Sequence, residues 1–184
     1  MNAGGADRSL PALAARAQLG DRAALDGLLR TLQDPLYQHI RGIVGDDDAA
    51  ADVLQDALLI ICRRLGTVRE LEWVRAWAYR VATREAVRSA RSARAHLHDA
   101  LESLPDLPAP GPEEPAIDPE FLAELPARLA ALPPAARVVL RMRYLQDLTQ
   151  PEIAEALEIP LGTVKSRISY GLAALRRSWT RNNQ

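Results

Sequence analysis

Residues 149–170 constrain the fold more than any other stretch, because they predict two short helices joined by a tight turn. Thr149 is a residue type that favours a helix N-cap, and Glu152, three positions later, completes the spacing of a capping box. A helix should therefore start at the residue after Thr149. The Glu-Ile-Pro at residues 158–160 ends it, and a second helix can begin near Pro160, whose fixed φ suits a first turn.

The second of these helices has two different faces. At about 100° per residue, Ser166 and Tyr170 point away from its apolar side chains. Thr163 lies close beside them, and Lys165 and Arg167 flank this outward face. The apolar side chains form one stripe that should be buried, namely Val164, Ile168, Leu172 and Leu175.

Small polar, basic and aromatic groups on the second of two short helices suit the major groove of DNA, where they reach base edges and phosphates. The early backbone amides of this helix, around Gly162, can also hold a phosphate. The alternative is an ordinary pair of helices within an all-α domain, with its charges on a solvated face. Periodicity alone leaves both interpretations open.

The charge of the chain is unevenly distributed. With 184 residues and 48% hydrophobic content, the chain is long enough for one ordinary domain or two small ones. The net charge of -1 hides a segment 1–98 that is weakly basic, a segment 99–126 that is strongly acidic and a segment 127–184 that is basic. The basic C-terminal segment agrees with a polyanionic partner, and the acidic middle should avoid DNA and favour a basic surface.

Cysteine and histidine usage gives no indication of disulfides or metal sites. Cys62 is the only cysteine, so neither an intramolecular disulfide nor a cysteine-based zinc site is available. His96 and His98 stand beside Asp99 like half of a metal site, but no further ligands recur, and surface residues are the preferred interpretation. We expect no metal and no cofactor.

The N-terminal residues do not resemble a signal peptide. They lack a basic start followed by an uninterrupted apolar run, and no segment approaches the ~18 apolar residues that a membrane helix requires. A reducing cytoplasm also fits the single cysteine best. We therefore expect a cytoplasmic protein without a membrane segment.

Helical periodicity begins after a leader, residues 1–19, that we expect to be frayed or partly helical. It runs over residues 21–44, where Pro35 is a position at which the helix could kink or divide. Gly45 predicts the end of this helix. The aspartates at 46–48 predict a fresh N-cap, because acidic residues are favoured at the positive end of the helix dipole.

The next helix, up to about residue 65, also has two faces. Asp52, Gln55 and Asp56 gather on one side and are candidates for a partner surface. The alternative is an ordinary solvated acidic face. The residues expected to face the core are Ala51, Leu54, Ala57, Leu58, Ile61, Cys62 and Leu65.

A third helical pattern, from about Glu70 to Arg94, carries a row of arginines. Glu85 is the only acid between Arg75 and Arg94, so self-repulsion within the row favours a nearby anion. Phosphate contact therefore explains the row better than a merely solubilising face. Spacings of four, four, three and three residues keep these side chains on one stripe: Arg80, Arg84, Arg88, Arg91 and Arg94.

Residues 99–119 are expected to be an extended acidic linker. Six of the 13 prolines fall between Pro105 and Pro119, and no Lys or Arg occurs from residue 95 to residue 127. The expected fold class is all-α. Two small helical domains, at residues 20–98 and 120–184, are joined by this linker, and the second domain contains the helix-turn-helix.

Two separated blocks resemble the extracytoplasmic-function (ECF) sigma factors, the two-domain sigma subunits of bacterial RNA polymerase. The likeness covers roughly residues 20–95 and 122–178. The first block carries Gly20-Asp21, the run Ala50-Ala51-Asp52-Val53-Leu54-Gln55-Asp56, and Trp77 on the following helix. The second block, which is similar to region 4 of the family, carries Leu132-Pro133, the Arg137 to Tyr144 helix, Glu152-Ile153-Ala154 and Gly162-Thr163-Val164-Lys165-Ser166-Arg167-Ile168.

The resemblance implies that region 2, the first domain, docks on the clamp helices of core RNA polymerase through the surface of Asp52, Gln55 and Asp56. It also implies that this domain opens the minus-ten promoter element. The acidic linker would lie in basic channels of the polymerase, and an anti-sigma factor could clamp the two domains. Region 4 would touch the polymerase flap and read the minus-thirty-five element of promoter DNA through Gly162, Thr163, Lys165, Ser166, Arg167 and Tyr170.

The chain departs from the family pattern at three of the positions that matter for DNA. The family usually has Asn and Asp where this chain has Arg84 and Arg88, and these arginines could strengthen backbone contacts while relaxing base selection. The turn of the helix-turn-helix commonly carries Gly, whereas Glu158 occupies it here. A left-handed Glu158 would cost on the order of 1 kcal/mol.

Two other functions stay open at this point. One is a free-standing helix-turn-helix regulator, which the separate first block and the acidic linker argue against. The other is a sigma-like protein that binds polymerase without reading promoters, which Arg84, Arg88 and Glu158 motivate. An enzyme is not expected, because no paired carboxylates, Ser/His/Asp set or Gly-rich phosphate loop occurs at a useful spacing.

Overall fold

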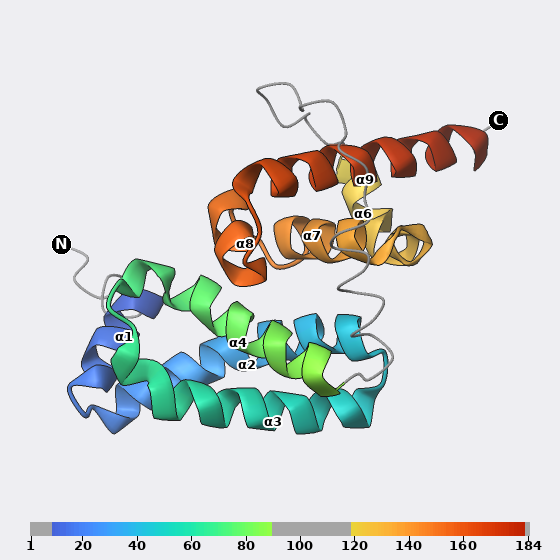
Figure 1. The fold of residues 1–184 in the computed structure, drawn as a ribbon. Helices are drawn as coiled ribbons and strands as arrows, with labels where there is room; N and C mark the ends of the chain where they lie inside the picture. The colour runs from blue at the N-terminus through green and yellow to red at the C-terminus, as the bar shows by residue number, and fades with distance from the viewer. Residues whose placement is uncertain (1–8, 90–118, 183–184) are drawn as a thin grey trace. The chain divides into compact units, whose positions relative to one another are not determined.

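The structure is a computed structural model that describes residues 9–89 and 119–182 (Figure 1). These residues are helical and include no strand, which confirms the expected all-α class. The chain divides into two compact units. Several predicted features lie outside the described residues: the linker up to residue 118, Arg91, Arg94, His96 and His98.

The first unit is built from α-helices that pack in pairs. In the described residues, α2, α3 and α4 pack against one another and α1 packs against α2 (Figure 1). Part of the expected leader is therefore helical, and Leu13 and Ala14 on α1 are buried. The helices are α1 (Leu10–Gln18), α2 (Arg22–Val44), α3 (Asp47–Arg64) and α4 (Val74–Ser89), with the 3-10 turns η2 (Leu65–Thr67) and η3 (Leu71–Trp73) between α3 and α4.

Asp21 shapes the corner between α1 and α2. Its carboxylate accepts a hydrogen bond from the backbone N–H of Ala24 (3.0 Å), which caps α2. It also accepts hydrogen bonds from Nε (3.0 Å) and Nη2 (2.7 Å) of Arg16. The backbone bond from Ala24 and, after it, the guanidinium of Arg16 hold the pKa of Asp21 below its ordinary value.

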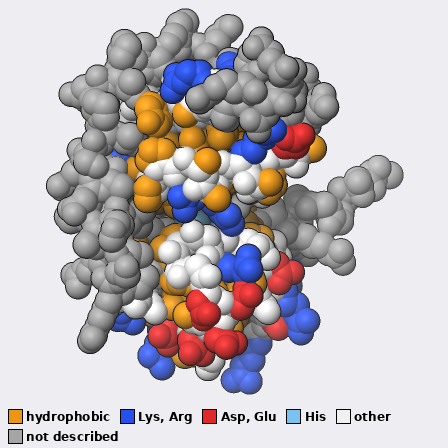
Figure 2. Space-filling view, turned by 90° about the vertical axis from the view of Figure 1, so that its right-hand side faces the viewer, with side chains coloured by type: hydrophobic (Ala, Val, Ile, Leu, Met, Phe, Trp, Pro, Cys, Tyr) orange, Lys and Arg blue, Asp and Glu red, His pale blue; other side chains and the backbone are white. Residues whose placement is uncertain are grey.

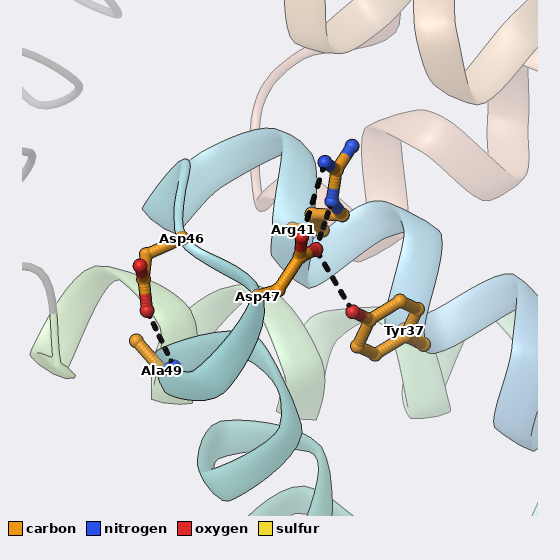
Figure 3. Close-up of polar contacts among 5 residues, drawn as sticks. All are labelled: Tyr37, Arg41, Asp46, Asp47 and Ala49. Atoms are coloured by element: carbon orange, nitrogen blue, oxygen red, sulfur yellow. Dashed lines mark hydrogen bonds and ion pairs between the residues drawn. The ribbon is translucent and has the colours of Figure 1, made fainter.

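The corner between α2 and α3 confirms the predicted stop and N-cap. α2 continues through Pro35 without dividing and ends at Gly45, whose φ of 81° lies in the left-handed region that favours glycine. Asp46 then caps α3 by accepting a hydrogen bond from the backbone N–H of Ala49 (2.8 Å; Figure 3). The sharp turn between these two long helices therefore has a local cause.

Asp47 ties the end of α2 to the start of α3 (Figure 3). The hydroxyl of Tyr37 donates to Asp47 Oδ1 (3.0 Å), and Arg41 forms an ion pair with the same carboxylate. The Arg41 guanidinium first, and the Tyr37 hydroxyl second, hold the pKa of Asp47 below its ordinary value. Its carboxylate in turn raises the pKa of Tyr37.

The buried face of α3 differs from the prediction at its first turn. Ala51 was expected in the core but is exposed, and Ala50 is completely buried in its place. Leu58 and Cys62 are half-buried. The reason is geometric, because at 100° per residue Ala51 lies about 100° from Ala50 and about 80° from Ile61 around the helix. The fully buried side of α3 consists of Ala50, Val53, Leu54, Ala57 and Ile61.

The second unit places the helix-turn-helix on a supporting helix, since α7 packs against α9. A Cβ at Gly171 of α9 would lie only 2.6 Å from Leu140 Cδ1 of α7, so the two backbones approach more closely than a side chain would allow. Leu145, directly after α7, is exposed, whereas Leu148 is buried. The elements are α6 (Pro119–Arg128), η4 (Leu129–Ala131), α7 (Pro134–Tyr144), α8 (Gln150–Leu157) and α9 (Leu161–Asn182).

The described residues contain neither a membrane-spanning helix nor a cluster of metal ligands. Among the described residues, every helix is too short or too polar to cross a lipid bilayer. In the same part of the chain, no three side chains of the types that ligate metals gather into a group that could hold an ion.

Candidate nucleic-acid interface

Both ends of α8 have the geometry that the sequence predicts. Thr149 Oγ1 accepts from the backbone N–H of Glu152 (3.3 Å), and the Glu152 carboxylate accepts from the backbone N–H of Thr149 (2.8 Å). This reciprocal pair is a capping box. At the other end of α8, Glu158 is left-handed, with φ 55° and ψ 43°, as its place in the turn implied. The helix pair therefore retains this turn despite a side chain where glycine would be unstrained.

Apart from Arg167, the two faces of α9 are as predicted. Its apolar stripe is buried, from Val164 to Leu175. On the other side, Gly162 and Lys165 are exposed, while Thr163, Ser166 and Tyr170 are half-buried.

The hydroxyl of Ser166 donates to the carbonyl oxygen of Thr163 (3.0 Å), which leaves its oxygen lone pairs available as acceptors. The first turns of α9 therefore present short hydrogen-bonding groups beside Lys165, a set that suits base edges. Further along the helix, Arg176 and Arg177 are exposed and add positive charge.

Arg167 is a correction to the sequence interpretation. It was expected to flank the outward face, but its exposed fraction is only 3%, and burial lowers the pKa of its guanidinium. Residue 167 is only about 60° from Val164 around the helix, so it borders the buried stripe rather than the outward face. A long arginine side chain at such a border can be covered along its apolar stem.

The arginine row of α4 is present in the described part of the helix. Arg84 and Arg88 are exposed, and Arg80 is half-buried. Arg88 forms an ion pair with Glu85, one turn earlier, so the one acid of this segment neutralises one member of the row. Arg91, the fourth candidate, lies outside the described residues.

Trp73 lies next to the arginine row and was not among the residues predicted from the sequence. Trp73 is the last residue of the turn η3, directly before α4, and 36% of it is exposed. Trp73 lies four residues before Trp77 and seven before Arg80, a spacing that in one continuous helix would put it on the side of the arginine row. That spacing was the signal that would have found it.

The residues predicted to form a partner surface lie on one side of α3. Asp52, Gln55 and Asp56 are all exposed. Leu59, one turn further on, is 44% exposed on the same side, and Asp48 is exposed four residues before Asp52. The i, i+4 spacing of these residues was the missed signal.

The aspartates at the start of α3 have different tasks. Asp46 caps the helix and Asp47 binds Arg41, while Asp48 makes neither of these contacts. Figure 2, which looks onto the side where α3 begins, shows acidic side chains gathered over the first unit with basic ones close by. The exposed surface of α3 therefore continues beyond the residues predicted from the sequence.

The residue ranges that contain these surfaces match two known protein families. Residues 28–96 match the family described as Sigma-70 region 2, and residues 128–177 match the family described as Sigma-70, region 4. The first range includes the candidate residues of α3 and α4. The second includes the whole helix-turn-helix.

Curated relatives cover nearly the whole chain. The RNA polymerase sigma-H factor of Pseudomonas aeruginosa is 30% identical over 178 residues, which span 90% of this chain and 91% of that protein. The ECF RNA polymerase sigma factor SigL of Mycobacterium tuberculosis is 30% identical over 162 residues, which span 85% of this chain and 92% of that protein. The ECF RNA polymerase sigma factor SigW of Bacillus subtilis is 27% identical over 168 residues, with coverages of 86% and 90%.

A solved structure shows the same fold. The structure of CnrH in complex with the cytosolic domain of CnrY is similar, with a TM-score of 0.61. The match covers 94% of this chain and 97% of that chain, at 22% sequence identity.

Proposed function

Because the chain belongs to the extracytoplasmic-function sigma factors, we propose that it binds core RNA polymerase and directs it to specific promoters. The observation that carries this proposal is the pair of family matches, each of which contains one of the two candidate surfaces. The protein acts as an initiation factor rather than as an enzyme. Region 2 would span residues 20–98, the acidic linker 99–119 and region 4 120–184.

Region 2 has two tasks in this proposal. Asp52, Gln55 and Asp56 on α3 dock on core polymerase, which their exposure on one side of the helix supports. The arginine row of α4 contacts the DNA backbone at the minus-ten element and helps to hold the melted strands. Exposed guanidinium groups in a row suit phosphates, because each phosphate carries a full charge at regular spacing.

Region 4 reads the minus-thirty-five element through the outward face of α9. Lys165, Ser166 and Tyr170 are the side chains on that face, with Thr163 beside them. The exposed backbone at Gly162, in the first turn of the helix, suits a phosphate. Arg167 is left out of this set because it is buried.

A protein partner that holds the sigma factor inactive is also part of the proposal. The similar structure is that of CnrH in complex with the cytosolic domain of CnrY. By analogy, we infer that an anti-sigma factor binds this chain. The chain itself would act in the cytoplasm, where RNA polymerase transcribes.

Reconstitution with core RNA polymerase tests the proposal directly. The full chain is added to core enzyme on a library of genomic fragments, and transcript starts are mapped. We expect starts that share one upstream and one minus-ten sequence and that vanish without the chain. Core binding without any start would select the sigma-like interaction protein, and palindromic DNA binding without polymerase would select the free-standing regulator.

A further inference from the structure

The inward face of α4 has few large side chains. Four of its seven described buried residues are alanines. After Tyr79, the fully buried positions are Ala82, Thr83 and Ala86, so the fully buried side chains in the half of the helix that bears Arg84 and Arg88 are small. Small side chains allow helices to approach closely, but a surface of uniform methyl groups specifies rotation and register poorly.

A buried polar contact crosses this interface from α2. His39 is 1% exposed, and its Nε2 lies 2.8 Å from Thr83 Oγ1. The Thr83 hydroxyl also lies 2.8 Å from the carbonyl oxygen of Tyr79, one turn earlier on α4. A carbonyl oxygen only accepts, so we assign the hydroxyl proton to that bond and the donor role to Nε2–H of His39.

His39 also contacts Tyr79 through its ring. The two ring centroids are 5.1 Å apart and the planes meet at 75°, an edge-on arrangement. The imidazole therefore contacts two residues that are one helical turn apart on α4. Because a hydrogen bond weakens steeply with distance and angle, a shift of α4 by one residue, about 1.5 Å and 100°, would break this contact.

The direction of the arginine row depends on the same rotation. Thr83 and Arg84 are consecutive, so their side chains leave the helix about 100° apart. We propose that His39 is a positioning residue, which sets the rotation and register of α4 through Thr83 and thereby aims Arg84 and Arg88 at the DNA backbone. This inference rests on the proposed function for its DNA partner and on the geometry of the first unit for its mechanism.

Paired substitutions separate the hydrogen bond from its packing. Thr83→Val keeps the shape and removes the hydroxyl, whereas Thr83→Ser keeps the hydroxyl. His39→Gln places an amide N–H close to the position of Nε2, whereas His39→Asn places it near Nδ1. With core polymerase and a promoter found by start mapping, Thr83→Val and His39→Asn should lower the yield of melted promoter about five-fold, the factor for one net hydrogen bond. Thr83→Ser and His39→Gln should stay within about two-fold of the wild type.

A distance measurement tests the register without polymerase. Spin labels at Gln33→Cys on α2 and Ser89→Cys on α4, both exposed positions, are introduced with Cys62→Ser. The distance distribution should be narrow in the otherwise unchanged chain and broader or displaced with Thr83→Val. An unchanged distribution overturns the proposal.

Two further outcomes are decisive. If the distribution changes but the yield of melted promoter does not, the arginine row is not aimed by this contact. His39 has only a structural role if Thr83→Val destabilises the protein and lowers its affinity for core polymerase as much as it lowers the yield of melted promoter. A wild-type chain that melts no promoter would remove the proposed function, while the distances would still decide whether His39 sets the register.

Discussion

Two helices carry the residues proposed to meet DNA, and they are held in place by different means. α9 buries a stripe of large aliphatic side chains, and its Gly171 lies against Leu140 of α7. α4 buries mostly alanines, and a buried hydrogen bond joins His39 of α2 to its Thr83. Interlocking aliphatic side chains determine the position of a helix by shape, whereas a small-residue face needs a directional contact to do so.

The outward faces of these helices differ as well. α4 presents a row of arginines, whereas the first turns of α9 present short polar groups beside Lys165, with Arg176 and Arg177 exposed only towards the end of the helix. Phosphate contacts supply affinity that is independent of sequence, and contacts to base edges supply selectivity. The arginine row of α4 is therefore proposed to supply affinity, and the short polar groups in the first turns of α9 are proposed to supply selectivity.

The largest expected effect follows from removing two arginines of α4. Arg84→Ala with Arg88→Ala should weaken promoter-complex formation on all sequences by on the order of 10- to 100-fold, because charged hydrogen bonds to phosphate are lost. The slope of log affinity against log salt should become shallower by about 1.4 to 1.8. Filter binding of the holoenzyme at several salt concentrations measures both.

Matched variants sharpen this comparison. Arg22→Ala with Arg64→Ala removes two exposed arginines from other helices and should leave the slope unchanged. Ser166→Ala on α9 should change the preference among upstream elements and leave the slope unchanged. An unaltered slope in the Arg84 and Arg88 variant would remove the assignment of affinity to α4.

The next effect concerns the way in which α9 is held. Gly171→Val should destabilise the protein by about 1–3 kcal/mol, because the new side chain overlaps Leu140. Gly162→Ala in the same helix meets no atom within 4 Å and should be neutral or stabilising by up to about 1 kcal/mol. Denaturant unfolding measures both variants, and equal effects would contradict the close approach of α7 and α9.

A smaller effect is expected at the two left-handed helix ends. Gly45 has φ 81° and Glu158 has φ 55°. Gly45→Ala should therefore cost about 1 kcal/mol, and Glu158→Gly should gain about as much. Asp147→Gly, at φ 52°, should gain less, because aspartate tolerates this region better than glutamate. Thermal unfolding ranks the three, and a loss of stability in Glu158→Gly would contradict the strain.

The smallest effect is a pH dependence of the first unit. Since the pKa of Asp47 is lowered from 3.8 in the folded state, its contribution to stability is complete above that value and is lost as the pH falls through the folded pKa. Asp47→Asn should therefore be less stable than the wild type at neutral pH and equal to it in strong acid. The pair is exposed, which keeps the difference small. Unfolding at several pH values measures it, and Tyr37→Phe is the control that keeps the ion pair.

The features that followed from the sequence are local ones. The capping box of Thr149, the end of α2 at Gly45 and the left-handed Glu158 each depend on residues only a few positions apart. The buried stripe of α9 depends on periodicity within one helix. Helix caps and buried stripes can be predicted without the tertiary structure, because the neighbouring backbone determines the hydrogen bonds at helix ends and the directions of the side chains.

Other features required the packing of separate elements. Arg167 and Ala51 were misplaced because both lie at the border of a buried face, where helical angle alone does not say which side is covered. The contact of His39 could not be predicted from a helical pattern, since its partner Thr83 is 44 positions away along the chain.

By itself, then, the sequence determined the helices, their caps and the residue types on their outward faces, because these depend on near neighbours. Only the tertiary structure decided which polar side chains are buried and how α4 is held on α2, because those contacts join positions that the chain brings together by folding.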